Sequence, residues 1–144
     1  MKALIYSLII CGLFIGCNTP KSIVNQSAKE QHLTTQDTVK IANDEIGYQI
    51  IIIEPGFNSW LASTAKPEGY YTQGYLEGKN LQYVTAYNQR VLQPQYYNSG
   101  LYTMQIDYQP NIDYGYEVNY KLYNYFIYFQ LKYKQQLAGY IPRI

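Results

Sequence analysis

Apolar and polar positions divide the chain into three parts. Residues 3–15 form a nearly unbroken apolar block at the N-terminus. Residues 18–45 are mostly polar, and their few apolar side chains follow no period. From Ile46 onward, apolar residues recur at the spacings that strands and helices require. The pattern predicts a leader segment, a flexible tether and one globular domain over residues 46–144.

The leader has the order of a secretory signal. Lys2 gives an early positive charge, the apolar block follows, and Gly16 is a small residue directly before Cys17. This order is that of a bacterial lipobox, in which cleavage leaves Cys17 as a lipidated N-terminus. We therefore expect residues 1–16 to be a signal peptide, and residues 17–45 to be the lipidated N-terminus and tether.

Two alternatives to a lipobox stay open. An uncleaved membrane anchor is one, although the apolar block is shorter than the ~20 residues that cross a bilayer. A plain secretory signal is the other, and it would leave Cys17 as a free thiol in an oxidising compartment. Lipidation accounts for the cysteine in a way that neither alternative does.

Four consecutive isoleucines mark the first predicted element of the domain. They belong to residues 48–53, which Gly47 precedes and Glu54-Pro55-Gly56 follows. A short β-branched run that ends in a Pro-Gly turn is typical of a strand. Because the run is apolar throughout, we expect both of its faces to be covered. We expect its edges to pair with residues 101–106 and 137–141.

Two helices are predicted between this strand and residue 94. The first covers residues 57–64, is capped by Asn58 or Ser59, and buries Trp60 and Leu61. The second covers residues 71–92 and carries an apolar stripe at helical spacing. The stripe consists of Leu76, Tyr83, Val84, Tyr87 and Val91, with Asn80 in its middle.

Residues 116–137 are predicted as the last helix. Their opening alternates as a strand would, and tyrosine favours strands. A helix explains more of the segment, because Glu117 and Lys121 form a pair four residues apart on a polar face. That face consists of Glu117, Lys121, Asn124, Tyr128, Lys132 and Gln135.

Together these elements predict an α+β fold, a mainly helical small single domain with a short sheet. Asn80 lies in the stripe of one long helix, and Asn119 lies at the edge of the apolar face of the other. An unpaired buried amide costs about 1–3 kcal/mol. We therefore expect the two amides to bind each other or tyrosine hydroxyls, which would fix the register of the helices. A functional pocket around them is the alternative.

The charge balance argues against nucleic acid as a partner. The chain has 11 Lys and Arg residues against 10 Asp and Glu residues. Binding to phosphates needs a basic excess, which this chain lacks. Attachment to a membrane must likewise come from the lipid on Cys17, because the sequence holds no polybasic patch.

The domain lacks the side chains that most catalytic and metal sites use. The one histidine, His32, lies in the predicted tether, Cys11 leaves with the signal, and Cys17 is lipidated. We therefore expect no catalytic triad, no zinc and no cofactor. Asp107, Asn111 and Asp113 suggest calcium ligands, but Gln109 and Pro110 depart from the pattern of an EF-hand loop.

Carboxylates are the remaining candidates for catalysis. The domain offers Glu54, Glu68, Glu77, Asp107, Asp113 and Glu117. A glycosidase needs two carboxylates ~5 to 9.5 Å apart, and Glu54 with Glu117 is the candidate pair. The structural alternative is that Glu54 caps a turn or pairs with Arg90, and that Glu117 interacts with its helix dipole and with Lys121.

Tyrosine is the unusual feature of the composition, with 19 residues. Most of the rings are expected to fill the core in place of Leu and Phe, because tyrosines occur on both the apolar face and the flank of the last helix. A second interpretation is that some exposed rings bind a sugar or a protein partner. The candidates for such a surface are Tyr70, Tyr71, Tyr96 and Tyr97.

Several linked motifs resemble those of an uncharacterised lipoprotein family of Bacteroidota. The resemblance covers about residues 48–138 and rests on Ile53-Glu54-Pro55-Gly56-Phe57, Trp60-Leu61, Tyr70-Tyr71, Asn88, Arg90, Pro94, Ile106-Asp107-Tyr108 and the segment from Asp113 to Phe126. It implies an envelope location and no activity, catalytic residue or ligand. No acidic run follows Cys17, so we expect the periplasmic face of the outer membrane.

The sequence thus predicts a lipid-anchored protein of the cell envelope with a non-enzymatic binding or scaffolding role. Its partner would be the membrane through the lipid, and an envelope protein or a glycan through the domain. The alternative is a small carboxylate-dependent hydrolase that acts on glycans with Glu54 and Glu117.

Overall fold

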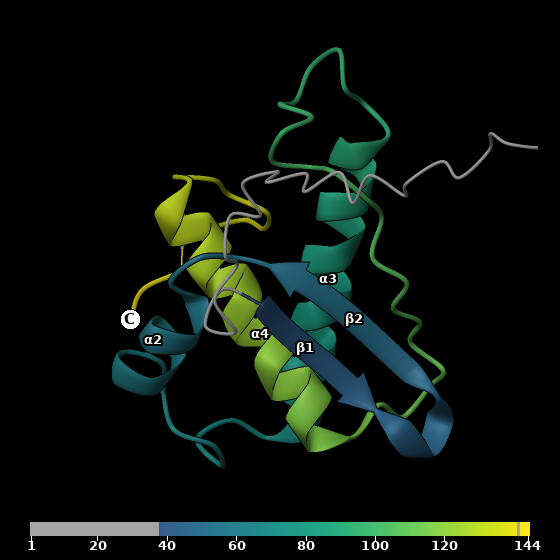
Figure 1. Ribbon diagram of the computed structural model, residues 1–144, viewed down its shortest axis with the longest axis vertical. Coiled ribbons are helices and arrows are strands. Elements are labelled where there is room, and N and C mark those ends of the chain that lie inside the picture. The colour runs from purple at the N-terminus through teal and green to yellow at the C-terminus, as the bar shows by residue number, and fades with distance from the viewer. Residues whose placement is uncertain (1–37, 141) are drawn as a thin grey trace, which may run out of the picture. The chain divides into compact units, whose positions relative to one another are not determined.

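The computed structural model describes residues 38–140 and 142–144 (Figure 1). The predicted signal peptide, Cys17, His32 and the tether as far as residue 37 lie outside the described residues. The elements, in order, are β1 (Thr38–Asn43), the 3-10 turn η2 (Asp44–Ile46), β2 (Tyr48–Ile53), α2 (Phe57–Ser63), α3 (Gln73–Val91) and α4 (Gly115–Lys132). This mainly helical chain with a short antiparallel sheet confirms the predicted α+β class.

The predicted end of the tether at residue 45 is wrong, because β1 lies within it. β1 pairs antiparallel with β2, and Thr38 lies opposite Ile53. The side chain of Ile41 is completely buried. Gly47 closes the hairpin at a φ of 63°, and the Asn43 amide donates to the carbonyl oxygen of Tyr114 (3.0 Å). These tertiary contacts order a segment whose composition alone suggests a flexible chain.

β2 is confirmed as a strand, but its predicted surroundings are wrong. Among the described residues, neither 101–106 nor 137–140 forms a strand, and β2 pairs with β1 alone. Its burial alternates: Ile50 and Ile52 pack against the core, whereas Ile51 and Ile53 are each 55% exposed. One face of β2 is open to solvent because the helices cover only its other face.

α2 begins after Gly56, not after a polar cap. Gly56 is the N-cap residue, with a φ of 86°, so the predicted N-caps Asn58 and Ser59 are wrong and both lie inside the helix. Phe57 is the buried residue of α2, while Trp60 and Leu61 are partly buried. The positive φ of Gly56 favours glycine, and a Cβ there would lie 2.8 Å from the Tyr128 hydroxyl oxygen, so that Tyr128 would have to move.

α3 confirms the predicted stripe, which contributes Leu76, Asn80, Tyr83, Val84 and Tyr87 to the interior. α4 is also confirmed, although it ends at Lys132, before the predicted residue 137. Its predicted polar face is wrong at Asn124, which is 4% exposed. Eleven of the 18 residues of α4 are buried, because other segments surround it on most sides.

α3 and α4 run in the same direction. Asn80 contacts Asn119 near their N-terminal ends, and the ring of Tyr87 contacts that of Phe129 farther along. A parallel pair needs a long return connection, and residues 92–114 supply it. Figure 1 shows this connection passing along the outer side of β2, so that β2 lies between it and β1.

Candidate functional site

Glu54 lies at the end of β2 and is nearly buried, with 6% exposure. Its carboxylate accepts hydrogen bonds from the Lys132 ammonium (2.6 Å) and the Tyr133 hydroxyl (3.0 Å). The proposed pairing of Glu54 with Arg90 is therefore wrong. Arg90 instead donates to the Tyr102 hydroxyl (2.6 Å), 12 residues along the chain. Glu54 thus ties the end of the sheet to the last turn of α4.

Glu117 is exposed at the first turn of α4 and forms the predicted pair with Lys121 (2.5 Å). Glu54 contacts the opposite end of the same helix. Glu117 and Lys132 are 15 positions apart in α4, which corresponds to about 22 Å of helix at ~1.5 Å per residue. This arrangement does not bring Glu54 and Glu117 together as a glycosidase pair.

The four candidate tyrosines occupy the two ends of α3. Tyr70 is 60% exposed, and its neighbour Tyr71 packs against Tyr75 and Tyr123. Tyr96 is 78% exposed beyond the other end of the helix. Its neighbour Tyr97 packs against Tyr102 and lies under the Arg90 guanidinium. The four rings therefore do not form one surface, and two of them are structural.

The predicted contact between Asn80 and Asn119 is confirmed. The Asn80 amide nitrogen donates to the side-chain oxygen of Asn119 (3.1 Å) and to its backbone carbonyl (3.0 Å). The same side-chain oxygen accepts from the Tyr108 hydroxyl (2.6 Å). Within the described part of the chain, the Asn80 amide oxygen is buried without a hydrogen bond. This network fixes α3, α4 and the return connection against one another.

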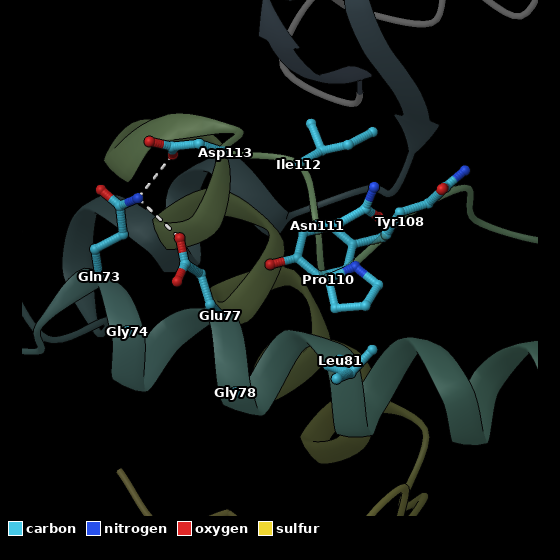
Figure 2. A pocket seen from close by; sticks show the side chains of 11 residues that line it. Gln73, Gly74, Glu77, Gly78, Leu81, Tyr108, Pro110, Asn111, Ile112 and Asp113 are labelled. Atoms are coloured by element: carbon cyan, nitrogen blue, oxygen red, sulfur yellow. Dashed lines mark hydrogen bonds between the residues drawn. The ribbon is translucent and has the colours of Figure 1, made fainter.

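A first open pocket lies between α3 and the segment 108–113, with a volume of about 560 Å³ (Figure 2). We call it the α3 pocket. Gln73, Glu77 and Asp113 converge at one end of it, as Figure 2 shows. The Gln73 amide nitrogen donates to both carboxylates, at 2.8 Å each. The two carboxylate oxygens therefore lie within twice that distance of each other.

The rest of the α3 pocket is apolar or neutral. Its wall on α3 consists of Gly74, Gly78 and Leu81, and a Cβ on either glycine would meet nothing within 4 Å. The lining contains no lysine or arginine. Sequence reasoning counted Glu77 and Asp113 among the carboxylates but did not pair them. The spacing of Gln73 and Glu77 by four residues was the available signal for their contact.

A second open site, the β2 groove, lies along the free edge of β2 and has a volume of about 680 Å³. One wall is β2 and the other is the segment 100–107. The floor consists of Tyr87, Tyr125, Phe129 and Tyr133. At one end the Tyr48 hydroxyl donates to the carbonyl oxygen of Asp107 (2.7 Å), and at the other lies Glu54. The exposed Met104, also in the lining, adds apolar surface.

Burial keeps the phenols of both sites in the neutral form. It raises the pKa of Tyr108, beside the α3 pocket, to about 12, and the nearby Asn80 amide opposes the shift. In the β2 groove, burial is the main cause of the raised pKa of Tyr125, and the charge of Glu54 adds to it. For Lys132, burial disfavours the charge, but the bond to Glu54 outweighs it and raises the pKa.

Within residues 38–140 and 142–144, no group of three or more His, Cys, Asp and Glu side chains is placed to hold a metal ion. The calcium candidates Asp107 and Asp113 bind amides of the protein: Asp113 accepts from the backbone of Gly115 (2.9 Å), and Asp107 from Gln109 (3.2 Å). In the same described part, no helix has the length and apolar character needed to span a bilayer.

Comparison with known proteins identifies one relationship. A family model described as a family of unknown function, DUF6146, matches residues 5–141. No curated protein and no solved structure gives a significant match. Because the match includes nearly the whole chain, the protein belongs to the DUF6146 family of unknown function.

Proposed function

We propose that this protein is held in the cell envelope by a lipid on Cys17 and binds a partner there without catalysing a reaction. The order of residues 1–17 supports the anchor, and the family match includes residues 5–17 together with the domain. In this proposal the family is a lipoprotein family of Bacteroidota, and the domain lies on the periplasmic face of the outer membrane.

The observation that carries the binding role is the carboxylate pair in the α3 pocket. In the described part of the chain, the ion pairs join Lys121 to Glu117 and Lys132 to Glu54. Glu77 and Asp113 take part in neither, and both lie beside an open apolar wall. Two close negative charges without a cation favour a positively charged group, to which ionised hydrogen bonds are the strongest. The pocket therefore suits an amine or guanidinium group of an envelope component.

The same geometry is less suited to hydrolysis. A glycosidase needs one protonated carboxyl as the acid, together with a second carboxylate. Here the same Gln73 amide donates to both carboxylates at 2.8 Å, so the structure does not set either carboxyl apart as the acid. The arrangement therefore presents two acceptor groups side by side, which suits the binding of a cation.

The anchor is tested by expressing Cys17→Ser beside the unchanged protein in cells fed an alkyne-labelled fatty acid. We expect the unchanged protein to be labelled and to fractionate with the outer membrane, and Cys17→Ser to be unlabelled. Mass spectrometry that shows an intact leader, or an unmodified Cys17, would contradict the proposal. Resistance to protease in intact cells, lost when the outer membrane is opened, tests the predicted face.

The binding role is tested with a photo-crosslinking residue in place of Leu81, at the pocket wall, in native envelopes. We expect a crosslinked product that is lost when Glu77→Gln and Asp113→Asn are combined. Glu68→Gln is the matched control, because it removes an exposed carboxylate outside the pocket. The site would not depend on its carboxylates if the unchanged protein, the double variant and Glu68→Gln all gave the same product. A product without a cationic group would also refute the proposal.

A further inference from the structure

The free edge of β2 is a preformed acceptor for another strand. In the described part of the chain, no backbone hydrogen bond beyond the ladder with β1 joins Gln49–Ile53 to another segment. In an antiparallel pair, every second residue directs its N–H and C=O groups away from its partner strand. These groups of β2 face the β2 groove, because all of β2 lines it. Such an unpaired edge is a template for pairing with another chain.

The opposite wall is held away from β2 by α3. The Asn88 side chain accepts from the backbone nitrogen of Ile106 (2.9 Å) and donates to its carbonyl oxygen (2.8 Å). Nearer the start of the segment, the Tyr87 hydroxyl donates to the carbonyl oxygen of Leu101 (3.2 Å). The segment 100–107 is thus fixed to the helix behind it and does not form the third strand. The groove is therefore built into the fold.

Charge and polarity define what the groove accepts. Its walls and floor are mostly apolar or aromatic, and its lining contains no lysine or arginine. The carboxylate of Glu54, at one end, is already neutralised by Lys132. Asp107 lies at the other end, and the exposed Asp44 and Glu45 lie in the adjoining turn η2. None of these three carboxylates belongs to an ion pair within the described residues.

We propose that the β2 groove binds an extended peptide segment of a partner protein, which adds a third strand to the sheet. The segment pairs its backbone with the free edge of β2 and places alternate apolar side chains on the aromatic floor. A basic residue at one end of the segment lies beside Asp107. Strand addition of this kind takes its affinity from main-chain hydrogen bonds and its specificity from the side-chain pockets. This inference does not depend on the α3 pocket.

The test uses the full chain and synthetic peptides as long as β2. One peptide alternates valine and threonine and ends in two lysines, a second ends in two glutamates, and a third carries a central proline in the lysine-ended sequence. We expect the lysine-ended peptide to bind and the glutamate-ended peptide to bind several-fold more weakly. The proline peptide should not bind, because proline removes a donor and does not fit a ladder.

Hydrogen exchange reports the mode of binding. We expect the lysine-ended peptide to protect alternate backbone amides between Gln49 and Ile53. Asp107→Asn should weaken the lysine-ended peptide roughly 1.5- to fivefold, the range of an exposed ion pair. Glu68→Gln, which removes an exposed carboxylate that lines neither site, should leave its affinity unchanged. Protection of β2, rather than of the α3 pocket, separates this proposal from the proposed function.

Several outcomes would overturn the inference. These are the absence of binding by all three peptides, equal binding of the proline peptide, and binding without alternate protection of β2. Unchanged affinity in Asp107→Asn would also overturn it. Concentration-dependent dimers that show the same protection without peptide would assign the groove to a second copy of the chain instead.

Discussion

Replacing Asn119 by leucine removes the centre of the buried polar network. The Asn119 side-chain oxygen accepts from the Asn80 amide and from the Tyr108 hydroxyl, and its amide nitrogen donates to the carbonyl oxygen of Gly115 (2.9 Å). After Asn119→Leu, the Tyr108 hydroxyl is buried without an acceptor, which costs about 1–3 kcal/mol. Asn80 keeps its bond to the backbone of residue 119 and loses the other, at a cost of about 0.5–1.5 kcal/mol. The free energy of unfolding should therefore fall by about 1.5–4.5 kcal/mol.

The assay is urea unfolding of the chain carrying Cys17→Ala, followed by circular dichroism and by the fluorescence of Trp60. The midpoint should shift while the slope m stays constant, because the surface exposed on unfolding is unchanged. Asn111→Leu is the control: Asn111 is exposed at the α3 pocket, and its replacement should change stability by less than about 0.5 kcal/mol.

A double-mutant cycle tests the stated cause. Tyr108→Phe removes the hydroxyl that Asn119→Leu leaves unpaired, so the double variant should be more stable than the sum of the single effects predicts, by about 1–3 kcal/mol. Strict additivity, or a loss below about 0.5 kcal/mol for Asn119→Leu, would refute the argument that the network is a coupled unit.

Two further predictions concern pH and two glycines. Burial raises the pKa of Tyr83 and Tyr108 to about 12, whereas a phenol in the unfolded chain ionises near pH 10. The contribution of these two tyrosines to the stability of the fold is therefore complete below about pH 10 and is lost as the pH rises toward 12. Urea unfolding should show stability falling above about pH 10, by up to ~1.4 kcal/mol per pH unit for each phenol, and a flat profile would contradict the burial argument. Gly56→Ala should lower stability by about 1–3 kcal/mol, because Gly56 has a positive φ and a Cβ there meets Tyr128. Gly78→Ala should raise stability by about 0.5–1 kcal/mol, because Gly78 lies within α3 and has open space around it. Thermal melting of both variants checks the opposite signs.

The helices could be predicted because their signals are local. The stripe from Leu76 to Tyr87 has the helical period, and the fold buries that same face. The contact of Asn80 with Asn119 was also predictable, because a buried amide in an apolar stripe requires a polar partner. The spacing of apolar residues therefore predicted the two long helices, α3 and α4, and one of the contacts between them.

The sheet and the site depended on contacts that no local pattern encodes. β1 is half polar in composition, lies within a mostly polar segment, and is ordered by pairing with β2 and by the burial of Ile41. Glu54 forms an ion pair with Lys132, which lies 78 residues away in the sequence. Gln73 meets Asp113 across 40 residues, and this long-range contact creates the carboxylate pair of the α3 pocket. Both Glu77 and Asp113 are visible as candidates in the sequence, but the topology that brings them together is not.

The position of α4 in the chain has a consequence for the order in which the protein can fold. α4 is the last of the described helices and strands, yet α2, α3 and β1 all pack against it. A nascent chain that has not yet released residues 115–132 from the ribosome therefore lacks the helix against which these three elements pack. The packing of α2, α3 and β1 must therefore wait until α4 has left the ribosome.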